Sequence, residues 1–186
     1  MHWPSLSVIT PSYNQAEFLE RTIASVLSQD YPALEYLVMD GGSTDGSVAI
    51  LERHAAAGKL RFVSQRDAGQ SDAVNQGFRR TSGDIIGWVN SDDLYAPGAL
   101  RAVGEYFAAH PEVEWLFGRC PIVDRELAYF RSSGDNKMSL QWRQSFREDL
   151  EAAARVARAG EGAWIVVHRL NGWKNSAAYW LFDRLR

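Results

Sequence analysis

The stretch Ile85-Ile86-Gly87-Trp88-Val89-Asn90-Ser91-Asp92-Asp93-Leu94-Tyr95-Ala96-Pro97 places two adjacent carboxylates directly after an apolar run. The run is typical of a buried strand, and the residues that follow it are typical of a turn. Adjacent carboxylates repel each other and are costly to bury without a partner, so Asp92 and Asp93 favour a bound cation. Their hard oxygen atoms suit Mg2+ or Mn2+, which fills its other positions with water and phosphate oxygens. Taken alone, the stretch also fits a pair of solvated turn acids.

Strands and helices alternate along the chain on both sides of this stretch. The expected strands cover residues 6–10, 36–40, 61–63, 84–89 and 114–117, and the expected helices cover residues 17–27, 47–57, 71–80 and 99–109. The spacing of Asn14 and Glu17 predicts a capping arrangement at the start of the first helix. The alternation predicts an α/β fold with three layers, in which helices cover both faces of a mainly parallel sheet.

Polar clusters follow four of the expected strands, at residues 10–14, 40–45, 67–72 and 90–93. Any one cluster fits turn chemistry alone, because Gly, Ser, Asn and Asp favour turns for backbone reasons. Ligands of parallel sheets bind at the carboxyl ends of the strands, so the shared position of the clusters favours one common site. No G-x-G-x-x-G motif follows the first strand and no Walker motif is present, which argues against a dinucleotide oxidoreductase or a P-loop enzyme.

The residues at these strand ends suggest how a nucleotide could be held. Tyr13 can pack against a planar base, and Asp40 can accept a hydrogen bond from a base N–H group. A metal ion at Asp92 would then hold a diphosphate. The chemistry that fits is displacement at the anomeric carbon of a sugar, where a cation stabilises the charge that grows on the departing nucleoside diphosphate.

Several motifs together resemble the N-terminal part of a family 2 glycosyltransferase with the GT-A fold. They occur in the order of that family and cover residues 5 to 124: the segments at 7–14, 25–29, 39–46, 67–77 and 88–93. The resemblance implies a nucleotide-diphosphate sugar donor of the UDP, GDP or dTDP type. It also implies transfer with inversion, in which a carboxylate base removes a proton from an acceptor hydroxyl.

The resemblance further implies roles for individual residues. Donor-binding positions are expected at Thr10, Pro11, Tyr13, Asn14, Asp40, Asp72 and Ser91, with Asp40 recognising the base and Asp72 positioning the donor sugar or diphosphate. The Asp-x-Asp metal motif of the family falls on Asn90-Ser91-Asp92. Asn90 therefore replaces the first acid, Asp92 is the expected principal ligand of Mg2+ or Mn2+, and Asp93 is its expected partner.

The chain departs from the family pattern after residue 124. One alignment makes residues 130–137 the segment that follows the catalytic region, as if an internal block were missing. A competing alignment takes residues 147–150 as the acidic motif, with Asp149 as the catalytic base and residues 163–167 as the next strand. Glu148 and Asp149 also fit simple charge at a helix N-terminus. The alternatives to a sugar transferase are a donor-binding remnant, a subunit that needs a partner, or a nucleotide-binding protein with another chemistry.

Composition and charge bound the remaining expectations. The 186 residues are 46% hydrophobic with one cysteine, Cys120, which excludes an internal disulfide framework. No signal peptide or membrane span is evident, so we expect a cytoplasmic protein. A nucleotide-sugar core is expected at residues 1–124, with a charge of −7, and a reduced helical acceptor side at residues 125–186, with a charge of +4.

The basic part of the sequence also contains several aromatic residues, such as Trp142, Trp164 and Trp180. This mixture fits contact with the inner face of a membrane and equally fits a solvated helical face around core aromatics. The expected acceptor is a polysaccharide or lipid-linked glycan of the cell envelope. A shortened acceptor side favours a homodimer. Nucleic acid is disfavoured as a partner because the chain has a net charge of −3 and carries no binding motif.

Overall fold

The computed structural model describes residues 3–117, 121–123, 129–132 and 166–169. In chain order the elements are β1 (Leu6–Ser12), α1 (Ala16–Leu27), β2 (Leu34–Asp40), α2 (Ser47–Ala56), β3 (Arg61–Ser64), α3 (Gln70–Arg79), β4 (Ile85–Trp88), α4 (Ala99–Ala109), β5 (Trp115–Phe117), β6 (Pro121–Val123), β7 (Tyr129–Ser132) and β8 (Val166–Arg169). The nine strands and helices predicted from the sequence are all present. Their ends differ by at most two residues from the prediction.

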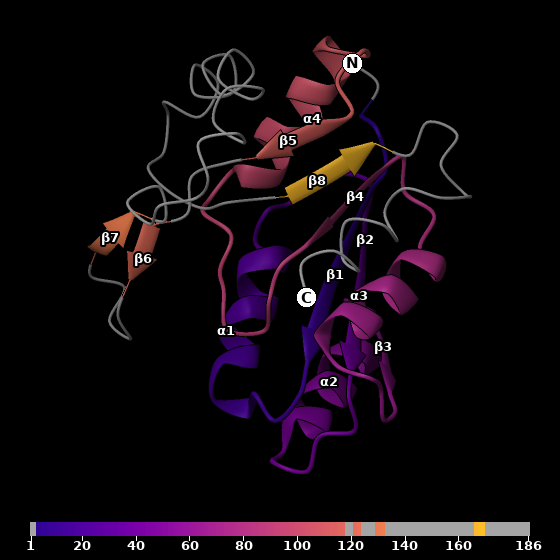
Figure 1. The fold of residues 1–186 in the computed structure, drawn as a ribbon, viewed down its shortest axis with the longest axis vertical. Helices are drawn as coiled ribbons and strands as arrows, with labels where there is room; N and C mark the ends of the chain where they lie inside the picture. Colours follow the sequence, from indigo (N-terminus) through magenta and orange to yellow (C-terminus); the bar gives the residue numbers. More distant parts are fainter. Residues whose placement is uncertain (1–2, 118–120, 124–128, 133–165, 170–186) are drawn as a thin grey trace.

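Six strands form one sheet in the order β3-β2-β1-β4-β8-β5, as Figure 1 shows. The pairs β1–β2, β1–β4 and β2–β3 are parallel, whereas β8 runs antiparallel to both β4 and β5. Strands β6 and β7 pair with each other in a separate antiparallel ribbon. The mainly parallel α/β sheet expected from the sequence is therefore confirmed.

Side chains that alternate along each strand pack on opposite faces of the sheet, in two separate hydrophobic cores. On β1, Val8 belongs to the core shared with α1, α2 and α4, while Ile9 belongs to the core shared with α3. Val38 and Leu37 on β2 divide in the same way. This alternation has the period of two that a strand imposes. It gives three layers, with α3 on one face of the sheet and the other three helices on the opposite face (Figure 1).

Helix α3 approaches β1 very closely at one position. A Cβ atom added to Gly77 would lie 2.6 Å from Cγ2 of Ile9, whose side chain is fully buried. Only a residue without a side chain fits this contact, because well-packed cores cannot absorb the extra volume without strain. The close approach holds the C-terminal part of α3 against the middle of β1.

The chain changes direction across the sheet between β1 and β4. It runs from β1 to β2 and β3 on one side, then returns to place β4 on the other side of β1. The last paired residues of β1 and β4 are Ile9 and Trp88, whereas β1 pairs with β2 as far as Ser12 and Asp40. A crevice at the carboxyl ends of the strands is the expected result of such a switch point.

The later part of the chain contributes one strand to the main sheet. The competing alignment predicted a strand at residues 163–167, and β8 contains the last two of these residues and continues to Arg169. Of the expected helical segment at residues 125–186, the described residues 129–132 and 166–169 form strands β7 and β8, and the rest of it, with Asp149, lies outside the described residues. Within the described ranges, no helix is both long and apolar enough to span a bilayer. The division at residue 124 remains a prediction.

Candidate donor-binding site

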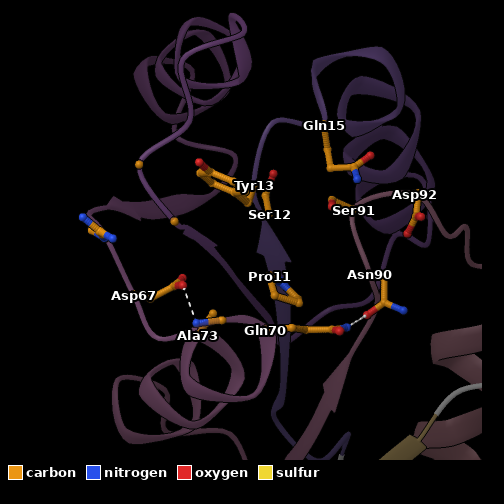
Figure 2. A pocket seen from close by; sticks show the side chains of 14 residues that line it. Pro11, Ser12, Tyr13, Gln15, Asp67, Gln70, Ala73, Asn90, Ser91 and Asp92 are labelled. Atoms are coloured by element: carbon orange, nitrogen blue, oxygen red, sulfur yellow. Dashed lines mark hydrogen bonds between the residues drawn. The ribbon is translucent and has the colours of Figure 1, made fainter.

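An open pocket of about 820 Å³ lies at the carboxyl ends of β1, β2, β3 and β4, where the sequence predicted a common site. Residues from all four strand-end loops line it: Pro11, Ser12, Tyr13, Gln15, Gly41, Gly42, Arg66, Asp67, Gly69, Gln70, Ala73, Asn90, Ser91 and Asp92. Figure 2 shows Tyr13 and Asp67 towards one end and Asn90, Ser91 and Asp92 towards the other, with Pro11 between them. Its volume suits a ligand larger than a single sugar.

One end of the pocket combines an aromatic ring with a carboxylate. Tyr13 is 62% exposed and is the only exposed large hydrophobic side chain among the described residues. A Cβ atom added to Gly41 would lie 3.1 Å from Oδ2 of Asp67 and 3.2 Å from Cδ2 of Tyr13. Gly41 therefore leaves the space between these two side chains open. Oδ1 of Asp67 accepts a hydrogen bond from the Gly69 N–H group at 2.8 Å, which fixes the carboxylate.

The opposite end of the pocket is organised around Asn90. Its Oδ1 accepts a hydrogen bond from Nε2 of Gln70 at 2.6 Å, the interaction drawn between these residues in Figure 2. Its Nδ2 donates to Oδ2 of Asp93 at 2.9 Å. An aspartate at position 90 would place a second negative charge beside Asp93 and repel it. Asn90 instead donates a hydrogen bond to Asp93. Asn90 thus joins the start of α3 to the acid pair.

The two acids differ in their surroundings although they are adjacent. Both residues are exposed, but Asp92 lines the pocket, whereas Asp93 does not and accepts a hydrogen bond from Nδ2 of Asn90. Desolvation of its carboxyl group raises the pKa of Asp93, and the negative charge of Asp92 raises it further. Both effects disfavour the charged form of Asp93.

The donor set at this end of the pocket fits a hard divalent cation. Within the described ranges no three His, Cys, Asp or Glu side chains converge, so the protein offers at most one or two carboxylates here. Mg2+ and Mn2+ accept such a set when water and substrate phosphates complete the coordination. When bound, the ion would neutralise negative charge on a diphosphate, with Asp92 as the carboxylate in the pocket and Asp93 next to it.

The side chain of Thr10 lies in the core, and its expected position near the donor stays a prediction. Its side chain is fully buried, and its Oγ1 lies 3.1 Å from the hydroxyl oxygen of Tyr36, a core residue. Thr10 has the same strand parity as Leu6 and Val8, so its side chain points into the core of α1, α2 and α4. A direct side-chain contact from Thr10 to a donor is not supported.

Asp40, the expected acid for base recognition, is buried beside the pocket. It is only 2% exposed and does not line the pocket. Its Oδ2 accepts hydrogen bonds from the N–H groups of Gly42 and Ser43 and from the hydroxyl of Ser64, at 2.7 to 3.1 Å. Its Oδ1 accepts from the Ser43 hydroxyl. The carboxylate therefore organises two strand-end loops, and its expected contact with a base stays a prediction.

Asn14 joins two loops and does not line the pocket. Its backbone N–H group donates to Oγ of Ser43 at 2.8 Å, and its Oδ1 accepts from the Thr44 N–H group at 2.9 Å. Asn14 adopts a positive φ of 52°, a conformation that asparagine tolerates better than most residues. Asn14 therefore has a structural role between the two loops, and its expected contact with the base or ribose stays a prediction.

The predicted capping arrangement at the start of α1 is wrong. The N-cap residue is Gln15, and it makes no side-chain capping bond. The N–H groups of Gln15 and Ala16 donate instead to Oγ of Ser47 and Oδ2 of Asp45, at 3.2 and 2.9 Å. These caps come from the loop after β2, which local sequence spacing does not reveal. Because the N–H group of Ala16 already donates to Asp45, this N–H group at the N-terminus of α1 is not available to bind a phosphate.

Acid is expected to weaken this cap. Hydrogen bonds from the Ser47 hydroxyl and from the Ala16 N–H group hold the pKa of Asp45 below its ordinary value of 3.8. A lowered pKa stabilises the fold above pH 3.8, and this contribution disappears as the pH falls through the folded-state pKa. Thermal unfolding of the wild type and Asp45→Asn should show a stability difference that shrinks on acidification from about pH 6 to about pH 2.5. A difference that does not vary with pH would contradict the assignment.

Asp72 also has a structural role in its own helix. Its Oδ2 accepts hydrogen bonds from the Ala68 N–H group at 3.1 Å and from Nε2 of Gln76 at 2.8 Å. These bonds hold the first turn of α3, and Asp72 does not line the pocket. The expected contact of Asp72 with donor sugar or diphosphate stays a prediction. Pro11, Tyr13, Ser91 and Asp92 do line the pocket, and their binding roles remain predictions.

The pocket also contains side chains that had no assigned role in the sequence analysis, namely Ser12, Gln15, Arg66, Asp67 and Gln70. Ser12 is 5% exposed, and its hydroxyl has no hydrogen-bond partner among the described residues. Arg66 is the single cation that lines the described pocket. Asp67 and Gln70 fall within the polar cluster at residues 67–72, so their position after the third strand was a usable signal.

Comparison with known proteins decides the family. The model for glycosyl transferase family 2 matches residues 7–157, which is most of the chain and includes Asp149. The chain belongs to glycosyl transferase family 2. Its sheet and helices have the GT-A architecture of the solved structures it resembles. The resemblance seen in the strand-end motifs is thereby confirmed.

Three individual proteins illustrate the similarity of this family 2 chain. A putative teichuronic acid biosynthesis glycosyltransferase, TuaG of Bacillus subtilis, is 33% identical over 105 residues, covering 55% of this chain and 42% of TuaG. Mannosyltransferase PcManGT from Pyrobaculum calidifontis, in complex with GDP-Man and Mn2+, has a TM-score of 0.59 and 22% identity, covering 100% of this chain and 47% of PcManGT.

The third protein is S. aureus TarS 1–349 in complex with UDP-GlcNAc. It gives a TM-score of 0.54 at 23% identity, covering 65% of this chain and 34% of the TarS chain. At such identities the two structural matches establish the fold alone. The chain spans less than half the length of each of the three proteins.

Proposed function

We propose that this family 2 chain transfers a sugar from a nucleotide-diphosphate donor to a polysaccharide or lipid-linked glycan of the cell envelope, with inversion and with Mg2+ or Mn2+ bound at Asp92. The observation that carries the proposal is one pocket with an exposed aromatic ring at one end and an exposed carboxylate at the other. These two features match the two ends of a nucleoside diphosphate. Its base would pack on Tyr13 and its diphosphate would lie towards Asp92.

The charge of the pocket supports a requirement for metal. Among the described residues that line it, Arg66 is the one cation, against Asp67 and Asp92, and Asp93 lies close by. A diphosphate would meet net negative charge without a bridging cation. A divalent ion at Asp92 reverses this repulsion and stabilises the leaving nucleoside diphosphate.

Asp67 is the proposed acceptor for a base N–H group. Its carboxylate lies beside Tyr13 across Gly41 and lines the pocket, whereas the carboxylate of Asp40 is buried beneath two loops. A base stacked on Tyr13 would present its edge towards Asp67. Recognition of the base is therefore assigned to Asp67 in place of Asp40.

The acceptor side of the proposal relies on the family match and on relatives. The match to residues 7–157 includes Asp149, the candidate base that would remove the proton of the acceptor hydroxyl. TuaG is named as a teichuronic acid biosynthesis enzyme, which supports an envelope polysaccharide as the product. A cytoplasmic location, contact with the inner face of the membrane and a homodimer belong to the same proposal.

Calorimetric titration of UDP, GDP and dTDP, with and without Mn2+, tests the proposal. We expect one nucleotide to bind in the presence of Mn2+ and much more weakly in its absence. Hydrolysis of the matching nucleotide sugar in the same samples would support a transferase that lacks only its acceptor. Metal-dependent binding without hydrolysis would favour the alternative, a donor-binding subunit. Absence of binding by all three nucleotides would contradict both.

A further inference from the structure

One face of α1 holds the loop that carries Asp92. Thr22 and Ser25 occupy positions i and i+3 of α1 and lie on the same side of the helix, and Gln29 lies in the turn that follows it. We call residues 90–98, between β4 and α4, the acid loop. All three side chains hydrogen-bond to the acid loop or to the first turn of α4. The second half of α1 and the turn after it therefore hold this loop in place.

The three contacts divide along the acid loop. Thr22 bonds to its beginning, as described below. Oγ of Ser25 accepts from the Tyr95 N–H group at 3.1 Å. Gln29 holds the end, where its Nε2 donates to the carbonyl of Ala96 at 3.0 Å and its Oε1 accepts from the Leu100 N–H group at 3.2 Å. Thr22 is therefore the member of this set that acts at the proposed metal site.

Thr22 contacts the backbone on both sides of Asp92. Its Oγ1 lies 2.8 Å from the carbonyl oxygen of Ser91 and 2.9 Å from that of Asp93, and its hydroxyl proton is shared between them. Thr22 is fully buried, so water cannot easily replace its hydroxyl. The shared bond fixes the peptide group between Ser91 and Asp92 and the peptide group between Asp93 and Leu94. These two groups flank the acid pair, so they restrict the backbone from which the Asp92 side chain leaves.

We propose that Thr22 is a positioning residue for metal-assisted donor binding, and that its hydroxyl holds the Ser91–Asp93 backbone so that Asp92 faces the metal. This inference rests on the proposed function. A cation with only one or two protein carboxylates depends strongly on the direction of each one. Removing a group that orients a metal ligand typically lowers the affinity for the metal by about 10- to 100-fold.

Two substitutions at position 22 separate positioning from ordinary stability. Thr22→Val keeps the shape of the side chain and removes the hydroxyl, whereas Thr22→Ser keeps the hydroxyl and removes a buried methyl group. Both variants are expected to lower the thermal midpoint. Only Thr22→Val is expected to weaken binding of Mn2+ together with nucleotide, by about 10- to 100-fold, while Thr22→Ser stays near the wild type. Calorimetry and the electron paramagnetic resonance signal of free Mn2+ measure this without turnover.

Gln29→Met is the matched control at the far end of the same contacts. It removes two hydrogen bonds to the acid loop and α4, so it should lower stability but leave the affinity for Mn2+ and nucleotide unchanged. If Thr22→Val does not fold, Ser25→Ala takes its place, because it frees the Tyr95 N–H group three residues after Asp92. A weaker but measurable loss of Mn2+ affinity, about threefold or more, is then expected for a group further from the ligand.

The outcomes distinguish this inference from the proposed function. Wild-type protein that shows no metal-dependent nucleotide binding overturns the proposed function, and the role of Thr22 with it. Wild-type protein that binds, together with Thr22→Val that binds equally well, overturns the role of Thr22 alone. Equal losses in Thr22→Val, Thr22→Ser and Gln29→Met would also overturn it, because they would reflect general destabilisation. Loss in Thr22→Val with retention in the other two supports it.

Discussion

Asp92→Asn is expected to abolish the effect of Mn2+ on nucleotide binding. The substitution keeps the size of the side chain but removes the exposed charge that the pocket directs at the proposed metal. Asparagine is a much poorer ligand for a hard divalent cation, and Asp93 is already bonded to Asn90. We expect the affinity for nucleotide in the presence of Mn2+ to fall at least about 100-fold, or about 2.7 kcal/mol. Calorimetric titration of the nucleotide that the wild type binds measures the loss.

Asp30→Asn is the control for this experiment. Asp30 is exposed beyond the C-terminal end of α1, and its positive φ of 47° is one that asparagine also adopts. The Asp30→Asn substitution removes one negative charge at a residue that does not line the pocket, so Mn2+-dependent nucleotide binding should remain. The free energy of unfolding of Asp92→Asn should stay close to that of the wild type, because an exposed side chain carries little packing. Metal-dependent binding that survives in Asp92→Asn would move the assignment to Asp93.

The layers of the fold followed from sequence patterns of two kinds. The strand pattern separates residues such as Val8 and Ile9 into opposite cores, and the helix pattern puts Leu19, Ile23 and Val26 on the buried side of α1. Both patterns arise from local geometry, so they can be found without knowledge of tertiary contacts. The position of the pocket followed from topology, because the carboxyl ends of parallel strands share one edge.

Strand β8 shows where local patterns stop being informative. Its residues are separated from β4 by more than seventy positions, yet it pairs between β4 and β5. An antiparallel strand inserted from a distant segment leaves no periodic signal that reveals its neighbours. The competing alignment located the strand but not its place in the sheet.

The site residues show a different limit. The motif residues Thr10, Asn14, Asp40 and Asp72 all lie near the pocket in sequence, but their side chains form hydrogen bonds within the protein. Loop-to-loop bonds such as those of Asn14 and Asp45 depend on two segments that are about 30 residues apart. Polar residues at strand ends therefore predict where the pocket lies. They do not reveal which of them face the ligand, apart from Thr10, whose strand parity already placed it in the core.

Asp40→Asn is expected to destabilise the protein without changing its preference among nucleotides. The buried carboxylate accepts two N–H groups and two hydroxyl groups, and it ties the loop after β2 to the end of β3. Asparagine loses the charge that strengthens these bonds and turns one acceptor into a donor. Because hydrogen bonds to a charged group contribute about 1.5–3 kcal/mol each, we expect the free energy of unfolding to fall by about 2–3 kcal/mol. Thermal or urea unfolding measures this loss.

Asp67→Asn is the matched variant, because it makes the same chemical change in the carboxylate that lines the pocket. Its stability should remain close to that of the wild type, but the ratio of its affinities for UDP, GDP and dTDP should change. In Asp40→Asn the three affinities should fall by a common factor, since Asp40 shapes the loops without touching the base. A changed ratio in Asp40→Asn with an unchanged ratio in Asp67→Asn would return base recognition to Asp40. Such a result would require Asp40 to exchange one of its four internal donors for the base when the nucleotide binds.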